Sequence, residues 1–122
     1  MGGEDKVRQT LIDAVDLQER DRILDMCCGT GNTTFTMAQK VGNHSQIKAI
    51  DLSSGQIRIA KKKNLFSNIE FMVIDASDTC FTESYFDKVV IAHALHEMPR
   101  VTRLAVLKEA KRIIKDGGTL AV

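Results

Sequence analysis

The sequence predicts an α/β protein in which a mainly parallel sheet lies between two layers of helices. Two observations support this prediction: short apolar runs alternate with stretches of helical periodicity, and several of the apolar runs end at an aspartate. Strands that alternate with helices are typical of parallel sheets whose crossover helices cover both faces. The 122 residues are predicted to form a single domain over residues 1–122.

Each element is predicted from its apolar spacing and from the residues that start and stop it. Apolar residues at four-residue spacing indicate one face of a helix, and short β-branched runs indicate buried strands. In chain order we expect a helix over Glu4–Leu17 with Val7, Leu11 and Val15 on one face, a strand over Arg22–Met26, a helix over Asn32–Val41 closed by Gly42, a strand over Gln46–Ile50, a helix from a Ser53 or Ser54 cap to Lys63, strands over Ile69–Ile74 and Phe86–Ala92, a helix from Pro99, and a strand over Thr119–Val122.

The last helix and strand carry two further expectations. The helix is predicted to bury a stripe made of Leu104, Leu107, Ala110 and Ile114, and to stop at the segment 115–118, which contains two glycines. A final strand at a sheet edge, with few charges to protect it, favours pairing with another chain. We therefore expect either a truncated chain or one that completes its sheet as a homo-oligomer through this strand.

Composition narrows the class of protein. The 17 basic and 16 acidic residues leave a net charge of +1, which argues against a nucleic-acid partner. No apolar run approaches the roughly 20 residues that a membrane span needs. The three cysteines, two of them adjacent, cannot build a disulfide framework, which is typical of a reducing cytoplasm. We expect a cytoplasmic protein.

The segment 23–32 passes from a strand, through Asp25 and two glycines, into a helix. Asp51 ends the next strand, twenty residues past Gly31. Glycines let a backbone approach a ligand closely, and a carboxylate at this distance suits the hydroxyls of a ribose. The unit is therefore predicted to bind a nucleoside cofactor.

Four blocks of the sequence resemble the class I S-adenosylmethionine-dependent methyltransferases, in the branch similar to ubiquinone and menaquinone biosynthesis enzymes. The blocks are Leu24-Asp25-Met26-Cys27-Cys28-Gly29-Thr30-Gly31, Asp51, Asp75-Ala76-Ser77-Asp78, and Phe86-Asp87-Lys88-Val89-Val90 leading into His93-Ala94-Leu95-His96-Glu97-Met98. The resemblance covers Arg22–Val122 and implies a Rossmann-like three-layer sandwich with five strands in the order 3-2-1-4-5. Family members generally have a glycine where Cys27 stands, and two more strands after the fifth.

The resemblance implies a cofactor and a reaction. The cofactor would be S-adenosyl-L-methionine, with S-adenosyl-L-homocysteine as product, and its sulfonium methyl would pass in line to a small-molecule acceptor. The implied cofactor-binding residues are Asp25 for the amino group, Cys27, Gly29 and Gly31 in the turn, Asn32 at the helix start near the carboxylate, Asp51 for the ribose, Leu52 against the adenine, Asp75 and Ala76 for the adenine edge, and Ala92 through its carbonyl.

His93 and His96 are the predicted catalytic residues, since the resemblance places their loop beside the transferring methyl group and histidine can act as a general base. They could equally be loop residues that pack or cap the next helix. Their order with Glu97 matches no zinc pattern, so no metal is expected.

Simpler alternatives stay open for the other site residues and for the whole chain. The two glycines could serve only a tight turn, Asp51 could start a helix, and Asp75 could be a loop residue. The chain could also be a non-catalytic cofactor-binding module that acts through a partner. A nicotinamide-dependent dehydrogenase is a remote alternative, because its fingerprint needs a glycine where Thr34 stands.

Overall fold

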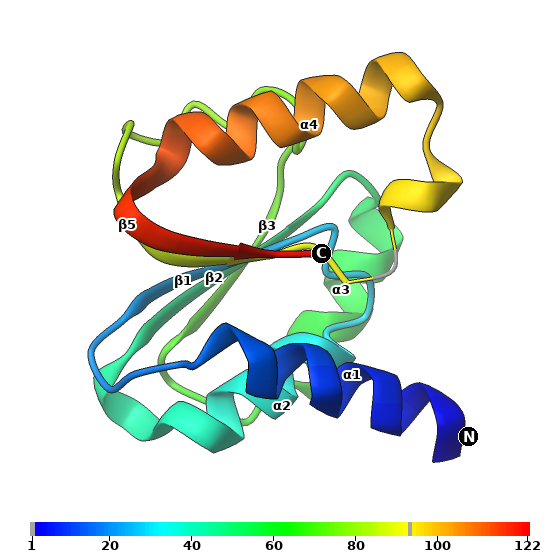
Figure 1. Cartoon of the computed structure of the whole chain (residues 1–122). Coiled ribbons are helices and arrows are strands. Elements are labelled where there is room, and N and C mark those ends of the chain that lie inside the picture. The colour runs from blue at the N-terminus through cyan, green and yellow to red at the C-terminus, as the bar shows by residue number, and fades with distance from the viewer. Residues whose placement is uncertain (1, 93) are drawn as a thin grey trace.

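A computed structural model describes residues 2–92 and 94–122 of the chain, with side chains from Lys6 onward (Figure 1). The elements alternate as predicted between helices and strands. In chain order they are α1 (Gly2–Val15), β1 (Arg22–Met26), α2 (Asn32–Val41), the short 3₁₀ helix η1 (Gly42–His44), β2 (Gln46–Asp51), α3 (Ser54–Lys63), β3 (Ile69–Val73), β4 (Phe86–Val90), the 3₁₀ helix η2 (Leu95–Glu97), α4 (Arg100–Ile113) and β5 (Ile114–Ala121).

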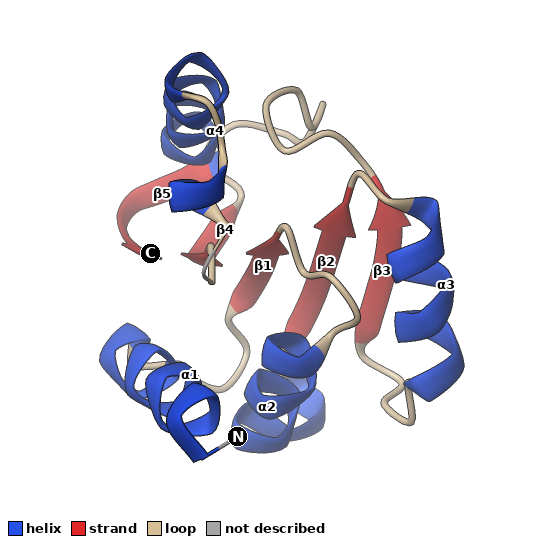
Figure 2. Ribbon diagram, turned by 90° about the vertical axis from the view of Figure 1, so that its right-hand side faces the viewer, coloured by secondary structure: helices blue, strands red, loops and turns tan. Residues whose placement is uncertain are grey.

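The strands form one parallel sheet in the order β3-β2-β1-β4-β5, which confirms the expected Rossmann-like topology. The helix α4 covers one face of the sheet, and α1, α2 and α3 lie on the other (Figures 1 and 2). β1 is the central strand and β5 is an outer strand, as predicted. The carboxyl ends of β1, β2 and β3 therefore meet along one edge of the molecule.

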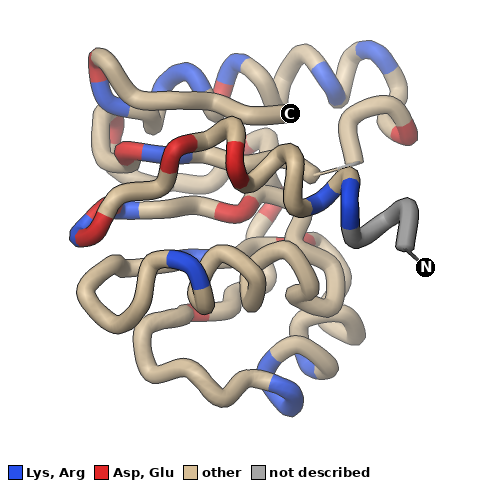
Figure 3. Tube along the Cα trace, turned by 60° about the horizontal axis from the view of Figure 1, so that its bottom comes forward, with Lys and Arg blue, Asp and Glu red and all other residues tan. Residues whose placement is uncertain are grey.

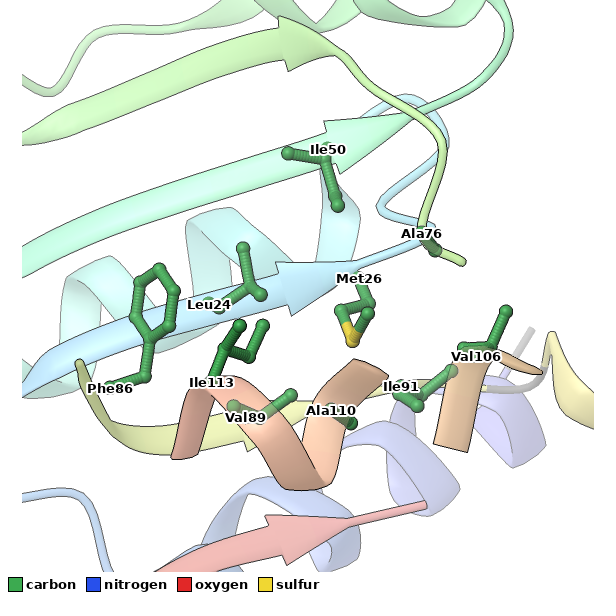
Figure 4. Packing of buried hydrophobic residues seen from close by; sticks show 10 residues of the cluster. All are labelled: Leu24, Met26, Ile50, Ala76, Phe86, Val89, Ile91, Val106, Ala110 and Ile113. Atoms are coloured by element: carbon green, nitrogen blue, oxygen red, sulfur yellow. The ribbon is translucent and has the colours of Figure 1, made fainter. Parts of the chain in front are cut away.

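Successive residues of each buried strand alternate between the two faces, as the pleat of a strand requires. On β1, Ile23 packs in the cluster under α1 and α2, whereas Leu24 packs in the cluster under α4. Figure 4 shows this second cluster between the sheet and α4, and its members are Leu24, Met26, Ile50, Ala76, Phe86, Val89, Ile91, Val106, Ala110 and Ile113.

The last strand begins earlier than predicted, at Ile114 rather than Thr119. Ile114 already pairs with Phe86, and the pairing then shifts so that Lys88 faces Thr119. The two-glycine segment predicted to stop α4 is therefore an irregularity inside β5, with Gly117 at a φ of 80°. Strands β3 and β4 end one and two residues earlier than predicted.

The buried faces of the first and last helices also differ from prediction. α4 buries Val106, Ile113 and the predicted Ala110, while Leu104 is 55% exposed. The predicted Leu107 and Ile114 are partly buried against the same cluster. In α1 the buried residues are Ile12 and Val15, since this helix meets the core through its C-terminal half. The Ser53 cap of α3 is confirmed, because its hydroxyl accepts a hydrogen bond from the Gln56 amide at 3.2 Å.

The loop after β3 is fixed to α4 by the buried carboxylate of Glu109. Glu109 Oε2 accepts hydrogen bonds from the Thr79 amide at 2.8 Å and from the Thr79 hydroxyl at 2.6 Å. The Arg112 guanidinium beside it, together with the Thr79 hydrogen bonds, lowers the pKa of Glu109 to about 2 against the raising effect of burial. Because this loop begins at Asp75, the network holds one side of the site described below.

Acidic and basic residues are dispersed over helices and strands (Figure 3). Across the described part of the chain, every helix is too short or too polar to cross a lipid bilayer.

Replacing Gly118 with alanine is expected to destabilise the chain by about 1–3 kcal/mol through overpacking. A Cβ at this position would lie 2.7 Å from Ile114 Cγ1 and 2.9 Å from the Asp87 carbonyl oxygen, and the backbone oxygen cannot move aside without disturbing β4. Urea unfolding measures the loss.

The matched control is Gly55→Ala in α3, where the nearest atom to an added Cβ is the Ser53 hydroxyl at 3.8 Å. This variant should be neutral or more stable by up to about 1 kcal/mol, since alanine favours helix. Equal losses in the two variants would contradict the steric explanation.

Candidate functional site

The turn after β1 is tied to the end of β2 by two hydrogen bonds from its backbone. The Cys28 amide donates to the Ile50 carbonyl at 2.8 Å, and the Gly29 amide donates to Asp51 Oδ2 at 2.9 Å. The other Asp51 oxygen accepts from the Ser53 amide at 2.9 Å. Asp51 therefore organises both the glycine turn and the start of α3, and its charge lies at the junction of the two strands.

The turn reverses through left-handed backbone at three alternate positions. Cys27, Gly29 and Gly31 have φ values of 62°, 58° and 94°. At Gly31 a Cβ would lie 3.0 Å from the Phe35 ring and 3.2 Å from Phe71, so only glycine fits there. For a residue other than glycine the left-handed region costs roughly 1–2 kcal/mol, so Cys27 holds a strained conformation that glycine would adopt freely.

The Cys27 thiol is half-buried near three carboxylates. Burial, followed by the negative charges of Asp51, Asp25 and Asp75, raises the pKa of this thiol to about 11. The thiol therefore stays protonated at neutral pH, and its environment opposes the thiolate that redox chemistry needs. The same negative surroundings favour a positively charged ligand.

Asp25 is a buried acid with an incomplete set of hydrogen bonds. Its side chain is 1% exposed, and Oδ2 accepts a hydrogen bond from the Thr34 hydroxyl at 2.7 Å. Oδ1 has no hydrogen-bond partner among the residues that the structure describes. Burial raises the pKa of Asp25 to about 7, against the lowering effect of Thr34 and with a further rise from Asp51. A cationic donor from a ligand would complete this carboxylate.

Asp75 and Ala76 follow β3 at the same edge of the sheet. The exposed Asp75 carboxylate accepts hydrogen bonds through Oδ1 from the Ser77 amide at 2.9 Å and from the Ser77 hydroxyl at 2.7 Å. These two bonds hold the pKa of Asp75 below its usual value. The arrangement is an Asx turn, which fixes the direction of the following backbone amides.

Two cavities open on this edge, and Cys27 lines both. The cavity of about 330 Å³ lies between the ends of β2 and β3 and α4, and it holds Asp51, Leu52, Asp75 and Ala76. The cavity of about 310 Å³ lies under α1, beside the start of α2. Its lining residues include Arg8, Asp25, Cys27, Gly29, Asn32 and Ala92. Of the ten predicted cofactor residues, nine line one of these cavities, and Gly31 is the N-cap of α2 beside them.

Of the two predicted catalytic histidines, the structure describes His96. His96 belongs to η2 and lines a third cavity, of about 750 Å³, with Val7 and Leu11 of α1, Leu95 and Arg103. His93 lies outside the described residues. Within the described ranges, no group of three or more His, Cys, Asp or Glu side chains is arranged to hold a metal ion.

Sequence reasoning missed two side chains of this region. Arg8 lines the smaller cavity, yet α1 carries only an amphipathic pattern, which gives no sign of a site. Thr34 is completely buried against Asp25. The sequence showed it only as the residue that fails the dehydrogenase fingerprint, and its position in the first turn of α2 was the available signal.

Known proteins that resemble this chain in sequence or in fold are methyltransferases or share their fold. A family model described as a methyltransferase domain matches residues 23–118. The chain is 34% identical over 116 residues to a demethylmenaquinone methyltransferase of Bacillus velezensis, covering 93% of this chain and 49% of that protein. It is 33% identical over 109 residues to a ubiquinone/menaquinone biosynthesis C-methyltransferase of Sinorhizobium fredii, covering 86% and 42%. The crystal structure of the PH0226 protein from Pyrococcus horikoshii superposes with a TM-score of 0.82 at 26% identity, covering 95% of this chain and 50% of that one.

The strand order and the glycine turn joined to an acidic strand end define a Rossmann-like nucleoside-binding domain. The chain belongs to the class I S-adenosylmethionine-dependent methyltransferases, and the relatives to which it is similar include enzymes of ubiquinone and menaquinone biosynthesis. S-adenosylmethionine is the cofactor of this family and S-adenosylhomocysteine its product. The chain spans about half the length of the curated relatives it matches.

The buried acid predicts a pH-dependent stability. Because the pKa of Asp25 is about 7 in the folded chain and 3.8 ordinarily, folding favours the protonated form. The chain is therefore most stabilised by this group below pH 3.8, and that stability is lost as the pH rises through 7. Asp25→Asn removes the titration, so its stability relative to the parent should rise by a few kcal/mol between pH 5 and pH 8, since each pKa unit corresponds to about 1.4 kcal/mol.

Urea unfolding of the parent and of Asp25→Asn, without cofactor, at several pH values measures this difference. A stability difference that stays constant over the whole pH range would contradict the assignment of the titration to Asp25.

Proposed function

We propose that this chain binds S-adenosylmethionine across the two cavities that meet at Cys27, and that it transfers the cofactor's methyl group to a small-molecule acceptor. The observation that carries the proposal is the shared lining of these cavities. Nine of the ten residues that the sequence assigned to the cofactor line one or the other. The adenosine would occupy the cavity at the ends of β2 and β3, and the methionine portion the cavity beside α2.

The adenosine end is supported by two acids and an exposed leucine. The Asp51 carboxylate would accept hydrogen bonds from both ribose hydroxyls while it keeps its bonds to the glycine turn. Asp75 would accept from the adenine amino group, and the Ala76 or Ser77 amide would meet a ring nitrogen. Leu52 is 70% exposed, and an adenine packed against it would cover this apolar surface.

At the methionine end of the cofactor, the chain offers a negative group for the ammonium and a positive helix end for the carboxylate. Asp25 Oδ1, which has no partner among the described residues, would accept from the cofactor's ammonium group, and the Ala92 carbonyl would accept from it as well. The N-terminus of α2 has no acidic residue in its first turn and no side-chain cap. Its positive end would therefore be open to the cofactor's carboxylate.

The reacting methyl group comes from the sulfonium of the cofactor, so the chain itself needs no nucleophile. The contribution of the chain is alignment and exclusion of water, which in well-oriented systems is worth roughly 7–11 kcal/mol. The negative charge around Cys27 would stabilise a sulfonium bound nearby.

The acceptor is proposed to enter through the third cavity. The segment 91–98 borders all three cavities: Ile91 and His96 line the largest, Ala92 the methionine side, and Ala94 the adenosine side. An acceptor in the largest cavity would meet mainly apolar side chains. The names of the relatives make demethylmenaquinone the first acceptor to assay. His96, or His93, would then take a proton from the acceptor.

Calorimetric titration tests the cofactor assignment. The parent chain should bind S-adenosylmethionine and S-adenosylhomocysteine, and should not bind NAD. Asp51→Asn should weaken binding by about 10–100-fold, because a charge-assisted pair of hydrogen bonds becomes neutral while an oxygen remains for the Gly29 amide. Asp78→Asn, an exposed acid three residues past Asp75, is the control and should bind as the parent does. Binding that is unchanged in Asp51→Asn, or equal for NAD, would contradict the proposal.

His96→Ala separates turnover from cofactor binding. If His96 takes the acceptor's proton, this variant should keep the parent's affinity for S-adenosylhomocysteine and lose at least tenfold in methyl transfer to demethylmenaquinone. Radiolabelled methyl transfer measures the rate. Cofactor binding without any transfer in the parent would favour the non-catalytic binding module.

A further inference from the structure

The hydroxyl of Thr34 contacts the one buried acid of the proposed methionine subsite. Thr34 lies in the first turn of α2 and is completely buried, and its Oγ1 donates to Asp25 Oδ2 at 2.7 Å. The bond spans the glycine turn and joins the end of β1 to the start of α2. Thr34 itself is absent from the lining of the two cavities described for the cofactor. Its influence on a ligand therefore passes through Asp25.

This bond occupies one oxygen of the Asp25 carboxylate and fixes the orientation of the group. The terminal torsion of an aspartate is broad and roughly two-fold, so a carboxylate without a partner presents either oxygen. Thr34 holds Oδ2, and Oδ1 is left without a hydrogen-bond partner in the described chain although Asp25 lines the cavity. The carboxylate is thus oriented before a ligand arrives, and less ordering is needed on binding.

We propose that Thr34 is a positioning residue for the cofactor: its hydroxyl holds Oδ2 of Asp25 and leaves Oδ1 for the ammonium group of S-adenosylmethionine. This inference rests on the proposed function and extends it to a side chain that meets no cofactor atom.

The charges around Asp25 explain why the hydroxyl matters. Burial and the Asp51 carboxylate, which faces Asp25 from β2, both raise the pKa of Asp25, and the Thr34 hydrogen bond lowers it. The Cys27 and Cys28 thiols of the turn are protonated, because burial raises the pKa of each. Arg8, from α1, lines the same cavity. Removing the Thr34 hydroxyl would raise the pKa of Asp25 further, so a smaller fraction of the carboxylate would be ionised at pH 7 and able to pair with an ammonium group.

A purely structural role for Thr34 makes a different prediction. A hydroxyl that only joins β1 to α2 would, when lost, weaken binding by the same factor at every pH. A hydroxyl that sets the ionisation of Asp25 would weaken binding most at low pH, and the loss would recede as the pH rises and Asp25 ionises. The pH profile therefore distinguishes the two roles.

The experiment compares the parent with Thr34→Val and Thr34→Ser. Calorimetry with S-adenosylhomocysteine, which carries the same amino-acid end as S-adenosylmethionine, is run from pH 6 to pH 9. We expect Thr34→Val to bind about tenfold more weakly at pH 7 and to approach the parent at pH 9, with Thr34→Ser close to the parent throughout. Thr34→Ala serves the same purpose if the valine variant does not fold.

A second measurement does not need the cofactor. Carbon-13 NMR of the Asp25 carboxyl in the free chain should give a higher titration midpoint in Thr34→Val than in the parent, and a nearly unchanged one in Thr34→Ser. An unchanged midpoint, or a loss of affinity that is the same at every pH, would overturn the inference while the parent still binds. A parent chain that binds no S-adenosylhomocysteine would overturn the proposed function, and this inference with it.

Discussion

The hydrogen bond from the Gly29 amide to the Asp51 carboxylate is the interaction on which the site depends. It lies directly after the bond from the Cys28 amide to the Ile50 carbonyl, so the pairing of β1 with β2 continues past the end of the strand. This continuation forces the turn into left-handed backbone at Cys27 and Gly29. The turn therefore lies at the carboxyl edge of the sheet, where Cys27 lines both cavities.

Parallel pairing then brings a third strand end to the same edge. Asp51 faces Val73 in the register of β2 and β3, and the Ile74 amide donates to the Asp51 carbonyl at 3.2 Å. The chain next enters the loop that starts at Asp75 and is held to α4 through Glu109. The site is thus bounded on one side by β-sheet hydrogen bonds and on the other by the buried hydrogen bonds from Thr79 to Glu109, which makes its shape a property of the whole fold.

Much of this could be predicted from the sequence, because it depends on local signals. Apolar runs of strand length and the Ser53 cap reflect physics that acts within a few residues. The spacing from Gly31 to Asp51 is longer, but it is a sequence signature of nucleoside-binding units. The resemblance to a methyltransferase family supplied the strand order and ten cofactor residues. The start of β5 at Ile114 was missed because glycines ordinarily signal a turn, whereas here they form an irregularity inside a paired strand.

The remaining features depend on contacts between distant elements. The local pattern predicts the helix that contains Arg8 and does not predict the cavity that Arg8 lines. The stripe of α4 that faces the core was assigned one position away from Val106 and Ile113, since two neighbouring apolar stripes run along that helix and only packing selects between them. The position of Thr34 in the first turn of its helix is a local signal, but its bond to Asp25 is not predicted locally, because Asp25 lies across the turn.

The burial of Asp25 links the stability of the folded chain to the binding of a ligand. Folding buries its carboxylate with one oxygen lacking a partner in the described chain, and burial raises its pKa to about 7, so the free chain loses stability through this group at neutral pH. An apolar residue of similar size would avoid that cost. Sites that bind charged ligands commonly break such a local rule, and the ligand provides the missing partner. In the proposed function the cofactor's ammonium fills this role. The free energy that folding leaves unsatisfied at Asp25 would then be recovered on binding, which links the stability of the chain to its occupancy by cofactor.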